Sequence, residues 1–132
     1  MIHEIELRTK SCTDFQDITS RIREIVTSDG IKNGLCQIFV PHTTAAVTIN
    51  ESADPSVATD ITSQLDSLIP RQGNYRHLEG NSPAHIKASL VGSSEVVLVE
   101  DSKIILGTWQ GIFFCEFDGP KNRIVIVKTI PD

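Results

Sequence analysis

Three of the four histidines are the side chains best suited to chemistry. His42 lies between two predicted strands, His77 in a polar loop, and His85 in the first turn of a predicted helix. Imidazole acts as an acid, a base or a metal ligand, and three protein ligands plus a water are typical of a catalytic zinc site. The spacing matches no zinc motif such as H-E-x-x-H. Two interpretations therefore stay open, a shared divalent-metal site (zinc or magnesium) and an acid–base site.

Hydroxyl, amide and carboxylate side chains gather where predicted strands end. Those that follow His42, or that follow the next strand, are Thr43, Thr44, Asn50, Glu51 and Asp54. Turn and helix-cap chemistry also accounts for such residues, Thr43, Asn50 and Asp54 above all. Capping and substrate contact both stay open for them, whereas capping hardly requires the imidazole of His42.

A predicted helix opens at residues 80–82 and places Asn81 beside His85. The free amides of a helix N-terminus readily bind phosphate or carboxylate groups. Arg76 and Lys87 are the candidates for a cationic partner. Because every helix has such an end, this pattern is compatible with an anionic substrate and does not by itself identify one.

Glu116 ends a segment in which alternate residues, including Ile112 and Phe114, share one apolar face. A carboxylate on such a face must be paired, hydrogen-bonded or protonated, because burying it bare is costly. Arg123 is available across the turn at residues 118–121. We therefore expect a structural ion pair between Glu116 and Arg123.

The only tryptophan, Trp109, stands next to the amide side chain of Gln110 and precedes a predicted strand. A tryptophan in this position is either a core anchor or a pocket wall that stacks on a ring. Cys36 and Cys115 lie within apolar strands, which predicts small buried hydrophobic residues and not catalytic thiols.

Three helices are predicted to position these residues, over 13–29, 54–69 and 82–91. A capping box from Thr13 to Gln16 starts the first helix, and Asp54 followed by Pro55 starts the second. The first two helices carry apolar stripes at helical spacing, which lets each pack one face against a sheet.

Strand-like segments occupy residues 2–9, 35–40, 43–50, 95–99, 104–106, 112–117 and 123–129. The short turns that separate the last four predict an antiparallel meander. Strands and helices do not alternate one for one. We therefore expect one α+β domain over residues 1–132, with antiparallel, sandwich-like β layers and about three helices packed on the sheet.

Composition argues against several classes of function. The net charge is −5, from 17 acidic and 12 basic residues without a basic cluster, so nucleic-acid binding is disfavoured. The acidic start does not look like a secretory signal, and no apolar run approaches the roughly 20 residues of a membrane span. We expect a cytoplasmic protein with neither a nucleic acid nor a membrane as partner.

The polar motifs form an ordered series along nearly the whole chain. They are His42-Thr43-Thr44-Ala45, Asn50-Glu51, Asp54-Pro55, Asp60, His77, Gly80-Asn81, His85, Gly107-Thr108-Trp109-Gln110, the segment from Glu116 to Pro120, and Arg123. Each motif is short, but in this order and spacing they resemble the YjbQ-like family, also called UPF0047 or the secondary thiamine-phosphate synthase family.

The resemblance implies a compact α+β homotrimer whose polar cleft binds an anionic or phosphorylated small molecule. For some members it implies thiamine-phosphate synthase activity, which joins a pyrimidine diphosphate to a thiazole phosphate and releases pyrophosphate. His42, His85 and Glu116 would be catalytic, and His42, His77 and His85 would hold the metal. The residues that would contact substrate are Thr43, Thr44, Asn50, Glu51, Asp54, Asn81, Trp109 and Gln110. A non-catalytic metabolite-binding protein and a metal-dependent hydrolase stay open as alternatives.

Overall fold

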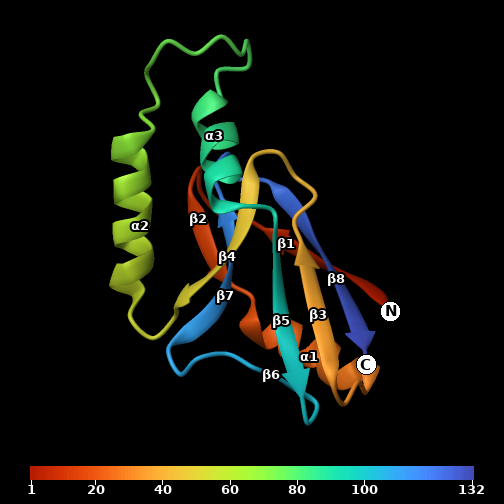
Figure 1. Cartoon of the computed structure of the whole chain (residues 1–132). Coiled ribbons are helices and arrows are strands. Elements are labelled where there is room, and N and C mark those ends of the chain that lie inside the picture. Colours follow the sequence, from red (N-terminus) through yellow and green to blue (C-terminus); the bar gives the residue numbers. More distant parts are fainter.

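Two antiparallel sheets face each other in the computed structural model, which describes all of residues 1–132 (Figure 1). The larger sheet has the strand order β1-β8-β3-β5-β6, and the smaller has the order β2-β7-β4. The strands are β1 (Ile2–Arg8), β2 (Asp14–Asp17), β3 (Gly34–Phe39), β4 (Ala45–Glu51), β5 (Ser94–Glu100), β6 (Lys103–Ile104), β7 (Gln110–Glu116) and β8 (Asn122–Pro131). The helices are α1 (Thr19–Asp29), α2 (Pro55–Leu68) and α3 (Ser82–Val91). The expected α+β class, with antiparallel sheets and three helices, is confirmed.

The central strand of the smaller sheet, β7, is buried on both faces. Ile112 and Phe114 point into the main core between the sheets, where Ile22 of α1 joins them. Phe113 and Cys115 alternate with them and pack on the other face, in a second cluster with residues of α3. The period-2 alternation of a strand thus lets one segment contribute to two apolar layers.

Helices α2 and α3 stand on the outer side of the smaller sheet, and α1 lies at the opposite end of the molecule (Figure 1). The start of α2 is as predicted, because Asp54 accepts a hydrogen bond from the backbone amide of Ser56 at 2.9 Å and Pro55 follows it. The start of α3 also agrees, with Pro83 in its first turn. None of the three helices combines the length and the apolar character needed to cross a bilayer.

The predicted start of the first helix at Thr13 is wrong. Residues Asp14–Asp17 form β2, which pairs antiparallel with β7, and α1 begins only at Thr19. The side chain of Asp17 accepts hydrogen bonds from the backbone amide and the hydroxyl of Thr19, which replaces the expected capping box. Pairing with the edge of β7 outweighs the local helical pattern of this segment.

The predicted meander is also wrong. Of the last four strands only β5 and β6 form a hairpin, because β7 belongs to the smaller sheet and β8 lies between β1 and β3. The sixth strand is also shorter than expected and ends at Ile104. The chain therefore crosses between the sheets twice in this region, and this crossing places β7 and β8 on opposite sides of the core.

Candidate functional site

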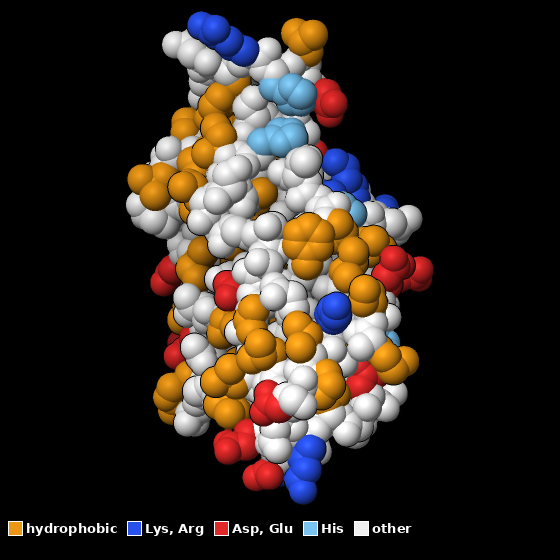
Figure 2. Space-filling model, turned by 45° about the vertical axis from the view of Figure 1, so that its right-hand side comes forward, with side chains coloured by type: hydrophobic (Ala, Val, Ile, Leu, Met, Phe, Trp, Pro, Cys, Tyr) orange, Lys and Arg blue, Asp and Glu red, His pale blue; other side chains and the backbone are white.

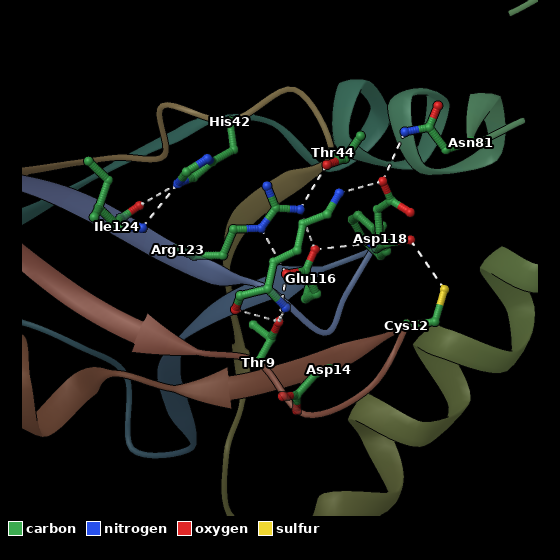
Figure 3. A network of polar contacts seen from close by, with 12 residues as sticks. Thr9, Cys12, Asp14, His42, Thr44, Asn81, Glu116, Asp118, Arg123 and Ile124 are labelled. Atoms are coloured by element: carbon green, nitrogen blue, oxygen red, sulfur yellow. Dashed lines mark hydrogen bonds and ion pairs between the residues drawn. The ribbon is translucent and has the colours of Figure 1, made fainter. Parts of the chain in front are cut away.

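His42 lies in the loop between β3 and β4 and contacts the backbone of β8 (Figure 3). Its Nε2 atom is 3.0 Å from the amide nitrogen of Ile124 and 3.1 Å from the carbonyl oxygen of the same residue. Pairing between β3 and β8 stops at Phe39 opposite Ile126. Nε2 either accepts from the Ile124 amide or donates to the Ile124 carbonyl, according to the tautomer, so the imidazole hydrogen-bonds to one backbone group of β8 beyond the end of β3.

The surroundings of His42 favour the neutral imidazole. Burial lowers the pKa of His42, and the positive charge of Arg123 lowers it further, against a smaller opposite effect of the hydrogen bond to the Ile124 carbonyl. The ring is therefore uncharged at neutral pH. A neutral imidazole has one nitrogen that donates a hydrogen bond and one that can accept a proton, and the tautomer decides which nitrogen has which role.

His42 and His85 line the same surface cavity, which has a volume of about 390 Å³. Thr43, Ser89 and Ser93 add hydroxyl groups to its wall. His85 and Ser89 lie on one face of α3, because residues four apart in a helix are neighbours. The cavity thus combines two imidazoles with hydroxyl donors and acceptors, a set able to hold a polar ligand and move a proton.

His77 approaches His85 but is not among the residues that line this cavity. The two rings meet edge to face, with centroids 5.2 Å apart, and the nearest carboxylate to His77 is the exposed Glu79 at 3.9 Å. No group of three or more His, Cys, Asp or Glu side chains is placed to hold a metal ion. One chain therefore does not supply the three-ligand set expected from the sequence.

The divalent metal, zinc or magnesium, stays a prediction. The rings of His77 and His85 lie close enough to share an ion, and a three-ligand site would need a further ligand, for example from a substrate or a second chain. A zinc titration of the wild type and of His77→Ala, read by calorimetry, decides whether they bind one.

Glu116 and Arg123 form the expected ion pair, which lies deep inside the protein (Figure 3). The carboxylate is fully buried and accepts bonds from Arg123 Nε at 2.8 Å, Arg123 Nη2 at 2.5 Å, the Thr9 hydroxyl at 2.8 Å and the Asp118 amide at 3.0 Å. Arg123 also donates to the hydroxyl of Thr44 at 2.8 Å. The pair therefore ties β7 of one sheet to β8 of the other.

Glu116 is a buried member of the ion pair and lies away from the cavity wall. It is fully buried and is not among the residues that line the cavity of His42 and His85. Its guanidinium partner lowers the pKa of His42 by charge, and thus links the buried pair to the cavity indirectly. Direct catalysis by Glu116, as expected from the resemblance, stays a prediction.

Asn81 and Asp118 form a polar group next to this network (Figure 3). The Asp118 Oδ2 atom accepts from Asn81 Nδ2 at 2.9 Å and from the Lys121 ammonium at 2.8 Å. Sequence reasoning missed Thr9, Asp118 and Lys121 as members of the network. Asp118 lies in a segment that was predicted to be a turn. Nothing in the sequence near Thr9 indicates that it contacts Glu116, more than one hundred residues away.

The other expected substrate contacts lie at the far end of the smaller sheet. The register pairs Ala45 with Glu116 at one end of β4 and Glu51 with Gln110 at the other, about 20 Å away for a six-residue step. There Asn50 bonds the amide of Glu51, Asp54 caps α2, and the side chain of Gln110 accepts from the amide of Gly107. Trp109 is 63% exposed and is thus no core anchor. One chain does not bring these residues to His42.

The two cysteines expected to be structural are buried. Burial, with a contribution from the charge of Asp29, raises the pKa of Cys36 to about 11, and burial also raises the pKa of Cys115. Neither thiol is a nucleophile at neutral pH. The prediction that both cysteines are buried structural residues is confirmed.

The family described as "UPF0047 protein YjbQ-like" matches residues 3–132. A UPF0047 protein of Methanocaldococcus jannaschii is 51% identical over 132 residues, which cover 100% of this chain and 96% of that protein. The protein YugU of Bacillus subtilis is 44% identical, with 98% and 99% of the two chains covered.

Solved structures of similar proteins have the same fold. A crystal structure of a YjbQ/UPF0047 protein from Clostridium acetobutylicum is 52% identical, covers 97% of this chain and 99% of its own, and gives a TM-score of 0.96. A structure from Sulfolobus solfataricus, described as a YbjQ-like protein of unknown function, is 33% identical, covers 100% and 97% of the two chains, and also gives a TM-score of 0.96. This chain belongs to the YjbQ-like UPF0047 family.

Proposed function

We propose that the cavity lined by His42 and His85 is a catalytic site that acts on a phosphorylated small molecule in a transfer reaction of the thiamine-phosphate synthase type. The observation that carries the proposal is the placement of two imidazoles on one cavity, one of them held neutral by its surroundings. Groups tuned in this way, in a concave site, are typical of acid–base catalysis.

The reaction breaks the bond between a methylene carbon of the pyrimidine and an oxygen of its diphosphate, and forms a bond from that carbon to the thiazole nitrogen. Its main demand is stabilisation of the negative charge that develops on the leaving pyrophosphate. His85 is the fourth residue of α3, and it lines the cavity one helical turn before Ser89. His85 and the hydroxyl of Ser93 would bind the leaving group, and His42 would orient the acceptor as an uncharged hydrogen-bonding partner.

Pyrophosphate release from the two proposed substrates tests the proposal. We expect wild-type protein to release it and His85→Ala to do so at least about 100-fold more slowly, because a positioned acid or base contributes on that scale. His42→Ala should show a loss of similar order. His3→Ala is the matched control, since this histidine pairs with Asp29 away from the cavity and its loss should leave the rate unchanged.

The possible results separate the alternatives. Equal rates in wild type, His42→Ala and His85→Ala would contradict a catalytic role for the cavity. Ligand binding without any turnover would identify a metabolite-binding protein. Metal-stimulated cleavage of other phosphorylated compounds would point to a hydrolase.

We also propose that the protein is a homotrimer that buries the outer face of the larger sheet. Leu98, Leu35 and Ile130 lie side by side across β5, β3 and β8, and 37–55% of each remains exposed. Phe39 and Val96 extend the apolar area. Figure 2 shows hydrophobic side chains gathered over the lower part of the visible face, beneath histidine side chains. Apolar area of this kind marks an interaction surface.

Leu98→Lys is expected to break this assembly, because an ammonium would be buried without a partner at the interface. Light scattering after gel filtration should give three times 14.5 kDa for the wild type and a lower mass for the variant. Leu68→Lys, which changes an exposed leucine on α2, should retain the wild-type mass. A monomeric wild type, or an unchanged mass for Leu98→Lys, would contradict the proposed interface.

A further inference from the structure

A second cavity, of about 260 Å³, lies on another side of α3 and shares no residue with the cavity of His42 and His85. Its wall includes Thr13, Arg71, Asn81, Lys87, Phe117 and Asp118. These residues come from the segment before β2, from the loop after α2, from α3, and from the turn after β7. Nothing in the proposed transfer reaction uses them.

One part of this wall is cationic. Only 6% of the Lys87 side chain is exposed, and its single hydrogen-bond partner is Asp66 of α2, which is itself 53% exposed. An ammonium group has three N–H donors, so two donors of this buried lysine remain available. Arg71 lies on the same cavity. Lys87 is paired with Asp66, so Arg71 adds the further positive charge at this end of the cavity, and the two cations together suit an anionic group.

Another part of the wall consists of hydrogen-bond acceptors. Asp118 directs one oxygen, Oδ2, at Asn81 and Lys121, which leaves Oδ1 available. Its pKa is below the ordinary value: burial acts to raise it, but the bonds from Lys121 and Asn81 lower it more, so the group is a carboxylate at neutral pH.

The amide orientation of Asn81 follows from the same contact. A carboxylate only accepts hydrogen bonds, so the NH₂ group of Asn81 must face Asp118. The carbonyl oxygen of Asn81 is then buried without any donor. A buried acceptor without a partner is unfavourable, and a donor brought by a ligand would offset this cost.

We propose that this second cavity binds a small zwitterion, with its phosphate or carboxylate group at Lys87 and Arg71 and its ammonium group at Asp118 and Asn81. Phe117, Pro83 and Ala84 supply the apolar wall against which the short carbon chain of such a ligand packs. The volume suits a molecule of a few heavy atoms, below the usual size of drug-like sites. The site is independent of the proposed transfer reaction.

Four probes that share parts of one structure test the proposal by amide chemical-shift changes in the ¹⁵N-labelled protein. Phosphoethanolamine and β-alanine carry both charges, ethanolamine carries the ammonium alone, and inorganic phosphate carries the anion alone. We expect at least one zwitterion to shift the amides of Asn81, Lys87 and Asp118 at concentrations ten-fold lower or more than either half-probe does. Comparison of the two zwitterions identifies the anionic group as phosphate or carboxylate.

Variants connect the response to the two ends of the cavity. Lys87→Met should weaken zwitterion binding at least ten-fold, and Asp118→Asn should weaken it while leaving the response to phosphate unchanged. Lys32→Met changes an exposed lysine elsewhere and should bind as the wild type does. If Lys87→Met fails to fold, as judged by the dispersion of its amide spectrum, Arg71→Met in the exposed loop makes the same test.

The outcomes that would overturn the proposal are equally distinct. Inorganic phosphate binding as tightly as the zwitterions, shifts centred on His42 and His85, or no shift with any probe would each do so. His85→Ala should retain zwitterion binding. A failure of the transfer reaction therefore leaves this result standing, and a failure here leaves the transfer reaction untouched.

Discussion

Arg123→Met is expected to lower the free energy of unfolding by about 3–5 kcal/mol, the usual cost of removing one partner of a buried ion pair. Glu116 is fully buried and would keep bonds only from the hydroxyl of Thr9 and the amide of Asp118. Methionine approximates the length of arginine, so the main loss is charge and hydrogen bonding rather than volume. Urea unfolding at pH 7, followed by circular dichroism, measures the difference.

Two further variants separate the loss of the buried ion pair from the loss of an arginine as such. Arg8→Met removes an arginine from an exposed position and should change stability by less than about 0.5 kcal/mol. Adding Glu116→Gln to Arg123→Met removes the uncompensated charge and should recover part of the loss. A loss below about 1 kcal/mol in Arg123→Met would show that the pair does not hold the two sheets together.

The effect of Arg123→Met should depend on pH in a defined direction. Burial acts to raise the pKa of Glu116, but the bonds from Arg123, the Asp118 amide and Thr9 lower it below its ordinary 4.5. In the unfolded chain the carboxyl binds a proton at higher pH than in the folded protein, so the pair stabilises the fold above the unfolded pKa and its contribution is lost as the pH falls through the folded pKa. As the pH falls below the ordinary pKa of 4.5, the wild type should thus lose stability more steeply than the variant does.

Local patterns were enough to predict most elements of the fold. The helix start at Asp54 and Pro55 depends on contacts within a few residues, and so does the start of α3. The boundary of α1 depended instead on the pairing of β2 with β7, whose partners are about one hundred residues apart in the chain. Hydrophobic periodicity in Phe15 and Ile18 fits a helix as well as it fits a short strand followed by a turn, and tertiary pairing decides between them.

The polar site shows the same division between near and distant contacts. The partner of Glu116 could be predicted because Arg123 is only seven residues away and a buried carboxylate needs a cation. The prediction of this pair was correct, but its reason was wrong. β7 and β8 do not form the expected hairpin, and the ion pair joins the two sheets instead. The contact between His42 and Ile124 spans 82 residues and has no local signal.

The residue types in a strand likewise do not show which of them lie near the polar network. Asn50 and Glu51 belong to the same strand as Ala45, yet the strand separates them from the polar network by its full length. Nearness in sequence made them candidates for one site, and the extended rise of a strand placed them at another end of the molecule.

Gly34→Ala is expected to destabilise the protein by about 3 kcal/mol or more, because two kinds of strain add at this position. Gly34 begins β3 and pairs with both β5 and β8, and its φ is +151°. A Cβ atom there would lie 2.1 Å from the carbonyl oxygen of Ile130 and 2.9 Å from the Cα of Pro131. Both neighbours are backbone of the adjacent strand, so neither can rotate away as a side chain would.

Gly30→Ala separates these two kinds of strain. Gly30 ends α1 with a φ of +67°, but no atom lies within 4 Å of the Cβ that alanine would add. Its substitution should cost only the left-handed backbone penalty of about 1–2 kcal/mol. Denaturant unfolding of both variants gives the comparison. Equal losses would show that β8 yields to the extra carbon, whereas a larger loss for Gly34→Ala would show that the junction of β3 with β8 is rigid at the point where the two strands begin to pair.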